Sequence, residues 1–140
     1  GYSDITQFLV EYVSVHPEVD HQVDEEQRIF GKENDDFVLD AHLGFHFVPD
    51  SIRICLICDL EEAARRILDD RGRTTETATN IKDSIVSSQK RRDTMHENFM
   101  SLYQVDIDDH SNFDLVLDTT SLSSDEVFER ASAFIDLQRT

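Results

Sequence analysis

The chain has 140 residues, enough for one domain of ordinary size, and its 39% hydrophobic and 31% charged residues support a core at the polar end of the globular range. Thirty acidic residues against 13 basic ones give a net charge of −17, which argues against binding to duplex nucleic acid or to an anionic membrane. The sequence has no apolar run long enough to span a membrane and no basic segment that would open a signal peptide, so we expect a soluble, cytoplasmic protein.

The first part of the chain has the patterns of two helices and a strand. Apolar residues at helical spacing predict a helix over residues 3–16, which ends before Pro17 because the residue before a proline avoids the helical region. A more polar helix is predicted over residues 18–30, with a stop near Gly31. Residues 37–41, FVLDA, are short, apolar and β-branched at the centre, and they predict a strand.

The clearest strand pattern covers residues 52–58 and contains both cysteines of the chain, Cys55 and Cys58. A CxxC spacing is typical of redox or zinc sites. Residues three apart on a strand point to opposite faces, however, and no second cysteine pair or nearby histidine completes a zinc set. We therefore expect two buried structural thiols.

The next part of the chain is predicted to be helical. Asp59 and Glu62 have the spacing of a capping box, and the helix that follows is expected to end at Gly72. A threonine-rich segment over residues 73–80 then precedes a long helical pattern from about residue 80 to residue 103.

The chain closes with a third strand and a last helix. Residues 113–118, FDLVLD, predict the strand, and a second capping box, formed by Ser123 and Glu126, opens the helix. Strands that are followed by helices through short loops are typical of an α/β domain with a mainly parallel sheet.

The basic residues are concentrated in one window. Eight of the 13 lie between Arg65 and Arg92, together with only four acids, so this window carries +4 and the rest of the chain −21. Arginine offers a planar fork of donors that matches phosphate oxygens and stays charged when it is desolvated. The window indicates phosphate recognition; the alternative is a pair of solvated helices with local salt bridges, such as Arg65 to Asp69. The eight residues are Arg65, Arg66, Arg71, Arg73, Lys82, Lys90, Arg91 and Arg92.

Asp40 ends the predicted strand at 37–41. Ligands of open α/β sheets lie beyond the carboxyl ends of strands, so an acid there can face a nucleotide or its magnesium; the alternative is an N-cap for the next helix. Neither G-x-x-x-x-G-K-[ST] nor G-x-G-x-x-G occurs, so the chain as given lacks the usual cradle for a nucleoside triphosphate. His42 and His46 have no third ligand nearby, and we predict no metal site among the chain's own residues.

The order of segments from Ile52 to Phe134 carries a resemblance. A strand leads into LEEAARRI, a helical stretch ends in KRRD, and YQVD, NFDLVLDTT and an amphipathic helix follow. HPEVD and VLDAHLG lie upstream. Taken in this order, the segments resemble the cytidylate kinases, especially the archaeal and cytidylate-kinase-like branch of the nucleoside monophosphate kinases. On this resemblance HPEVD belongs to the helical monophosphate-binding region and VLDAHLG to the strand that follows it.

The resemblance implies a three-layer P-loop-kinase-like α/β domain with a mainly parallel sheet and an Arg-rich helical lid, incomplete because the P-loop strand and helix are absent. It implies one domain over residues 1–140. In this domain, residues 1–36 are the helical acceptor-nucleotide region, 37–58 the core strands, 59–106 the helix and lid, and 107–140 the last strand and C-terminal helix.

The implied activity is transfer of the γ-phosphoryl group of ATP, bound with Mg²⁺, to CMP or a related monophosphate, with the lid neutralising the phosphates. The expected catalytic residues are Arg71, Arg73, Arg91 and Arg92, where either Arg91 or Arg92 reaches the transferred group. The expected substrate-binding residues are Asp40, His42 and Arg65.

Three departures from the family pattern limit this reading. His42 stands where an arginine usually contacts the monophosphate, Asn98 or Phe99 replaces a second lid arginine, and the sequence begins after the P-loop. The chain is therefore expected to be inactive by itself, and the alternative is a non-catalytic kinase-derived domain that binds a nucleotide or a protein.

A third alternative is an acidic structural module whose arginines only make salt bridges.

In the fold that the resemblance implies, the P-loop strand lies between the strands predicted at 37–41 and 52–58. Its absence would leave one edge of each of these strands unpaired, which favours a dimer or other association through the two edges. A longer gene product, a strand supplied by another chain, or direct closure of the two strands would also resolve this, and we expect the first.

Overall fold

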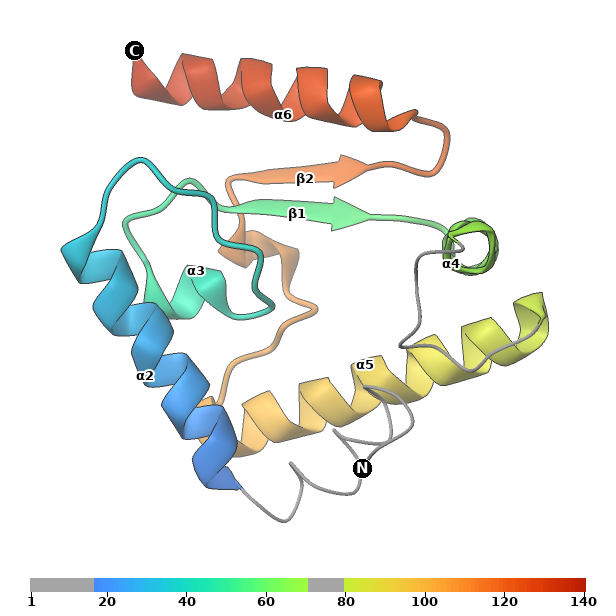
Figure 1. The fold of residues 1–140 in the computed structure, drawn as a ribbon, viewed down its shortest axis with the longest axis horizontal. Coiled ribbons are helices and arrows are strands. Elements are labelled where there is room, and N and C mark those ends of the chain that lie inside the picture. The colour runs from blue at the N-terminus through green and yellow to red at the C-terminus, as the bar shows by residue number, and fades with distance from the viewer. Residues whose placement is uncertain (1–16, 71–79) are drawn as a thin grey trace. The chain divides into compact units, whose positions relative to one another are not determined.

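The computed structural model describes residues 17–70 and 80–140 (Figure 1). The helix predicted over residues 3–16, and Arg71, Gly72 and Arg73, lie outside the described residues. None of the described helices combines the length and apolar character that crossing a membrane requires. The helices and strands are α2 (Pro17–Glu33), α3 (Gly44–Phe47), β1 (Ile54–Ile57), α4 (Leu60–Asp69), α5 (Ile81–Tyr103), the 3-10 helix η3 (His110–Asn112), β2 (Leu115–Asp118) and α6 (Ser124–Arg139).

The chain divides into two compact units. The first unit comprises residues 1–23 and 59–108, and it contains α4, α5 and the loop that follows α5. The second unit comprises residues 24–58 and 109–140, and it contains most of α2, the two strands, α3 and α6. The structure is thus a mixture of helices and a small parallel sheet, consistent with an incomplete α/β kinase-like domain.

The sheet of the second unit consists of β1 and β2, which run parallel side by side (Figure 1). Ile54 pairs with Leu115 at one end and Ile57 with Asp118 at the other. Both strands were predicted, and each is shorter than its apolar pattern because regular pairing covers four residues. The two strands run parallel, and α4 and α5 are among the helices that lie between them in the described part of the chain, which confirms the expected parallel α/β connection.

The strand predicted at residues 37–41 is wrong: this segment has no regular structure. A strand is stable only where a neighbouring strand pairs with its backbone, and among the described residues β1 pairs only with β2. Val38 is accordingly 95% exposed. Apolar and β-branched composition indicated a strand here, but composition supplies no pairing partner.

Cys55 and Cys58 are free thiols, as expected, but both are only half-buried. Cys55 lies within β1 opposite Val116, and Cys58 follows the end of the strand. The prediction that neither cysteine forms a disulfide is therefore confirmed. The prediction that both are buried is wrong, because a two-stranded sheet covers little of its own surface.

The core of the second unit includes the α3 turn, which packs against α2, and Leu117 of β2, which is 9% exposed. Leu43 and Phe47 are 2% and 3% exposed. α2 continues past Gly31 to Glu33 rather than stopping there, and a Cβ at position 31 would lie 2.7 Å from a γ-carbon of Val48. Gly31 is therefore required for close packing of the helix and is not its terminator.

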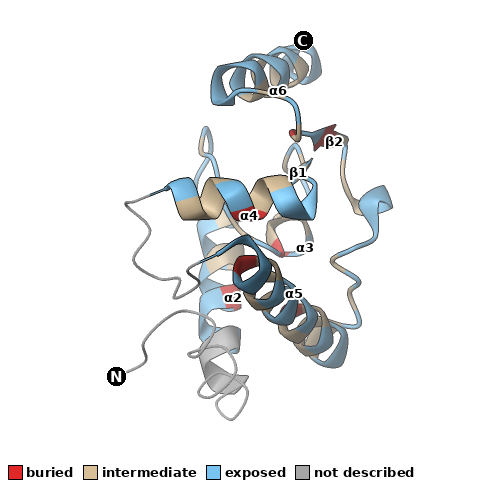
Figure 2. Cartoon of the chain, turned by 90° about the vertical axis from the view of Figure 1, so that its right-hand side faces the viewer, coloured by how far each residue is buried: buried red, intermediate tan, exposed pale blue. Residues whose placement is uncertain are grey.

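α6 begins as its sequence predicts. The Ser123 hydroxyl accepts a hydrogen bond from the Glu126 amide (3.2 Å), and the Glu126 carboxylate accepts one from the Ser123 amide (2.7 Å), which completes the capping box. No residue of α6 is buried (Figure 2). Phe128 and Leu137 are 71% and 73% exposed. Local capping, rather than burial, therefore defines where this helix begins.

In the first unit, Asp59 caps α4 by accepting hydrogen bonds from the amides of Glu61 and Glu62. In a capping box the Glu62 carboxylate would accept a hydrogen bond from the Asp59 amide. Here it accepts hydrogen bonds from the Arg65 and Arg66 side chains instead. The N-cap prediction is thus confirmed for Asp59, and the role of Glu62 differs.

The packing between α4 and α5 includes a buried hydroxyl. The most buried residues of the two helices are small, Ala64 at 2% and Ser84 at 1% exposure, and the Ser84 hydroxyl has no hydrogen-bond partner. We expect Ser84→Ala to raise the free energy of unfolding by about 1 kcal/mol, since it removes an unsatisfied buried polar group. Urea unfolding followed by circular dichroism measures this. Ser101→Ala, on the exposed part of α5, is the control for helix propensity alone, and an equal effect of both substitutions would contradict the prediction.

Candidate functional site

α5 carries the central part of the predicted cationic window. The helix begins at Asn80, whose side chain accepts a hydrogen bond from the Asp83 amide, and it ends at Gln104, which adopts a left-handed conformation with φ 55°. Its length places Arg91 and Arg92 in the middle of the helix, where Arg91 is half-buried and Arg92 is exposed. The basic residues on the two helices are Arg65 and Arg66 on α4 and Lys82, Lys90, Arg91 and Arg92 on α5.

The arginines of α4 lie in a local ion-pair network. Arg65 is 2.7 Å from the Glu62 carboxylate and 2.6 Å from that of Asp69, and Arg66 is 2.8 Å from Glu62. Hydrogen bonds from the Arg65 and Arg66 side chains lower the pKa of Glu62 to about 2, and the Glu62 carboxylate raises the pKa of Arg65. The salt bridge between Arg65 and Asp69 was predicted by the alternative in which the cationic window is a pair of solvated helices with local salt bridges.

Arg92 lies next to an acidic loop. Its guanidinium donates hydrogen bonds to Asp108 Oδ1, with Nε at 2.9 Å, and these bonds lower the pKa of the Asp108 carboxyl. The other oxygen of Asp108 is 3.1 Å from Nδ1 of His96, and an oxygen of Asp106 is 3.5 Å from the same nitrogen. The ligand atoms of these three residues lie within 4.8 Å of one another.

This second cluster, which we call the His96 cluster (His96, Asp106 and Asp108), was not found by sequence reasoning. Its members are 10 and 12 residues apart and form no recognised metal motif. The available signal was the position of His96 one helical turn after Arg92, together with the Asp-x-Asp pattern just beyond the helix. Whether the loop turns back toward the helix depends on the backbone of Gln104.

Asp40 and His42 belong to the second unit, where both are exposed. No hydrogen bond or ion pair joins Asp40 to another residue in the described part of the chain. The N-cap of α3 is Leu43, without a side-chain cap, so the alternative in which Asp40 caps the next helix is wrong. The carboxylate of Asp40 is thus presented to solvent, and His42 lies in the turn before α3.

Polar groups lie at the carboxyl ends of β1 and β2. Thr119 Oγ1 donates a hydrogen bond to the Ile57 carbonyl (3.0 Å), and Asp118 Oδ1 accepts from the Thr120 hydroxyl (2.6 Å) and amide (3.0 Å). The Thr120 bonds lower the pKa of Asp118. This is the edge at which open α/β sheets bind ligands, although the sequence singled out Asp40 rather than Asp118.

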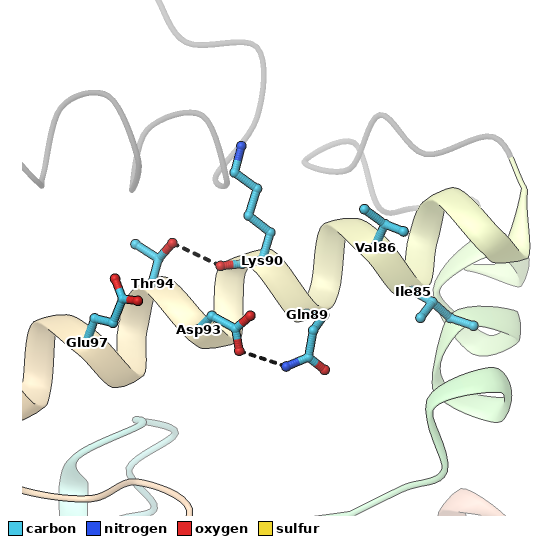
Figure 3. Close-up of a pocket in the computed structure, with 7 residues that line it drawn as sticks. All are labelled: Ile85, Val86, Gln89, Lys90, Asp93, Thr94 and Glu97. Atoms are coloured by element: carbon cyan, nitrogen blue, oxygen red, sulfur yellow. Dashed lines mark hydrogen bonds between the residues drawn. The ribbon is translucent and has the colours of Figure 1, made fainter.

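The surface of α5 also carries an open pocket of about 430 Å³ (Figure 3). Figure 3 shows that the labelled side chains all come from α5. The Thr94 hydroxyl donates a hydrogen bond to the Lys90 carbonyl, and the Gln89 side-chain amide donates one to the Asp93 carboxylate. A smaller pocket of about 210 Å³ is lined by residues around Arg65 and Ile81. Neither Arg91 nor Arg92 lines either pocket, so the two arginines lie on a different part of the helix surface. The larger pocket is lined by Ile85, Val86, Gln89, Lys90, Asp93, Thr94 and Glu97.

Comparison with known proteins identifies the relatives of this chain. A cytidylate kinase of Pyrococcus furiosus is 32% identical over 89% of this chain and 62% of its own length, and one of Thermococcus kodakarensis is 29% identical over 89% and 62%. An S-adenosylmethionine-dependent nucleotide dehydratase of Lacinutrix mariniflava is 32% identical over 84% of this chain and 23% of its own length.

The repeated match to archaeal cytidylate kinases over almost the whole chain confirms the resemblance, and the chain belongs to the cytidylate-kinase-like family. It spans less than two thirds of the length of these relatives. No family model matches the chain. No solved structure matches it either.

Proposed function

We propose that this chain is the acceptor and lid portion of a nucleoside monophosphate kinase that transfers the γ-phosphoryl group of ATP to CMP or a related monophosphate. The observation that carries the proposal is the match to several cytidylate kinases over about nine tenths of the chain. The chain contributes a parallel β1–β2 pair and an Arg-rich helical pair, which on this proposal are parts of a P-loop-type fold and of its lid.

The arginines of α5 would bind the phosphates. Arg92 already binds a carboxylate with two guanidinium nitrogens, and a phosphate group accepts the same planar fork. Arg91 or Arg92 would neutralise the charge that develops on the transferred group. Arg71 and Arg73 are proposed for the same purpose, and Arg65 for substrate binding.

Asp40 and His42 would bind the acceptor nucleotide. Magnesium is usually held by one or two carboxylates together with the phosphates of the nucleotide, and the solvent-facing carboxylate of Asp40 fits this use. Bound magnesium would neutralise phosphate charge during transfer. The proposal places the reaction in the cytoplasm. It also includes association of the chain with another strand through the edge of β1 that faces away from β2.

Calorimetric titration of the 140-residue chain with CMP, and then with ATP and magnesium, tests the proposal. We expect saturable CMP binding that is weakened about tenfold or more in Arg91→Ala or Arg92→Ala, because each removes a charge-assisted phosphate contact. Arg130→Ala, on α6, is the matched control and should leave CMP affinity unchanged. Because the sequence contains no G-x-x-x-x-G-K-[ST], we expect weak ATP binding and no phosphoryl transfer by this chain alone.

A folded chain that binds neither nucleotide would contradict the acceptor-site proposal. CMP binding that is equally strong in the Arg91, Arg92 and Arg130 variants would locate the nucleotide away from α5. Either result would remove the arginines of α5 from the proposed phosphate site.

A second candidate is a non-catalytic nucleotide-binding portion of a larger nucleotide-modifying protein. The observation that favours it is the relative from Lacinutrix mariniflava, in which the matched segment makes up only 23% of a protein whose name gives it a nucleotide dehydratase activity. Competition between CMP and CTP separates the two candidates. An acceptor site binds the monophosphate more tightly, whereas a portion that holds a nucleotide for another reaction can prefer the triphosphate.

A further inference from the structure

We propose that the His96 cluster is a binding site for one divalent transition-metal ion, such as Zn²⁺, Mn²⁺ or Co²⁺. The site lies entirely within the first unit, and it uses one imidazole nitrogen from α5 and one carboxylate oxygen from each of Asp106 and Asp108. The proposal does not depend on kinase activity, and it concerns a place different from the magnesium that accompanies ATP.

The donor atoms have the spacing that a metal ion requires. Nδ1 of His96 is 3.1 Å from Asp108 Oδ2 and 3.5 Å from Asp106 Oδ1. An ion with bonds of about 2.1 Å holds neighbouring ligand atoms roughly 3 Å apart, a spacing close to the two distances from Nδ1, and all three ligand atoms lie within 4.8 Å of one another. The donors come from two elements that the chain brings together, not from one continuous acidic run.

The histidine distinguishes this cluster from an ordinary acidic patch. A single ring nitrogen faces two carboxylates, and one N–H group donates a good hydrogen bond to only one of them. A metal ion accepts all three donors at once. One imidazole with two carboxylates suits first-row transition metals, whereas calcium and magnesium favour sites made of oxygen alone.

Groups outside the three ligand atoms orient the carboxylates. Arg92 holds Asp108 Oδ1, which leaves Oδ2 directed to His96, and the Asp108 amide donates to Asp106 Oδ1 at 2.8 Å. Outer hydrogen bonds of this kind fix ligands in metal sites. His96, Asp106 and Asp108 have side-chain exposures of 35%, 50% and 42%, which leaves space for water or a substrate group at the remaining coordination positions.

Cobalt titration of the full 140-residue chain tests the site, because coordinated Co²⁺ gains visible absorption bands that the aqueous ion does not show at the same intensity. We expect saturation at one ion per chain, displacement by Zn²⁺, and about tenfold or greater weakening in His96→Gln and in Asp106→Asn. His110→Gln and Asp93→Asn are matched controls from outside the cluster and should bind Co²⁺ as the unmodified chain does.

The controls separate a defined site from general attraction of cations to a chain of net charge −17. Equal binding in all variants, or no saturable binding, would overturn the proposal. Circular dichroism of each variant establishes that the fold is kept, and the partly exposed positions of His96 and Asp106 make each substitution compatible with folding. Nucleotide binding is measured separately, so failure of the metal site and failure of the proposed function give different results.

Discussion

Replacement of Phe47 by alanine is expected to lower the free energy of unfolding of the second unit by about 3–5 kcal/mol. Phe47 is 3% exposed and forms the core of this unit together with Leu43 and Leu117. The Arg28 guanidinium lies 5.2 Å from the centre of its ring, so the substitution also removes a cation–π contact. This loss approaches the whole stability of a small domain, and we expect the second unit to be largely unfolded in the variant at 25 °C.

Urea unfolding followed by circular dichroism measures this effect, and Phe128→Ala is its matched control. Phe128 is 71% exposed on α6, so its loss should change stability by less than about 0.5 kcal/mol. Phe47→Leu keeps most of the apolar volume and should give an intermediate value. A Phe47→Ala variant as stable as Phe128→Ala would show that the α3 turn does not form the core.

Replacement of Asp114 by asparagine is expected to lower the free energy of unfolding by about 1–2 kcal/mol at pH 7, an estimate reduced for partial solvent exposure. Asp114 Oδ2 accepts hydrogen bonds from the Arg53 amide (2.8 Å) and Nε (3.1 Å), and Oδ1 accepts one from Arg53 Nη2 (2.8 Å). The Arg53 carbonyl accepts from the Asp114 amide in return (2.8 Å). These bonds join the starts of β1 and β2, and an amide cannot reproduce the charged, bidentate contact.

The effect of Asp114→Asn should depend on pH. Hydrogen bonds from the Arg53 side chain lower the pKa of Asp114, so the ionised carboxylate stabilises the fold above the ordinary aspartate pKa of about 3.9. As the pH falls through the lowered pKa, the folded state also takes up the proton and this contribution is lost. The stability difference between the two proteins should therefore be full at pH 7 and shrink steadily below about pH 4. A difference that is the same at pH 7 and at pH 2.5 would contradict the assigned ion pair.

The elements that sequence predicted well are those with local signals. α5 and α6 follow from helical periodicity, and α6 also from the Ser123 and Glu126 pair that caps it within four residues. Residues 37–41 failed because a strand requires a partner elsewhere in the chain, and no local pattern supplies one. The continuation of α2 beyond Gly31 was missed for a related reason, since the packing of Val48 is visible only in three dimensions.

In the candidate site, too, the contacts between residues close in sequence could be predicted, and those between distant residues could not. The salt bridge between Arg65 and Asp69 could be predicted because the two residues are one helical turn apart. The pairing of Arg92 with Asp108 spans 16 residues and a change of chain direction, so the charge count could place Arg92 in a cationic window but could not identify its partner. The family resemblance was visible from the order of weak segments along most of the chain, and the relatives confirm it.

The left-handed backbone at Gln104 has a consequence for the loop that follows it. A non-glycine residue with φ 55° carries a strain of roughly 1–2 kcal/mol, which neighbouring contacts must offset. If residue 104 took helical angles instead, α5 would continue into the loop, and Asp106 would lie about 15 Å along the axis from His96. One pair of backbone dihedral angles thus determines whether the three ligand atoms converge or are spread along a helix. Binding of an ion at the His96 cluster would oppose that extension and would hold the end of α5 at Tyr103.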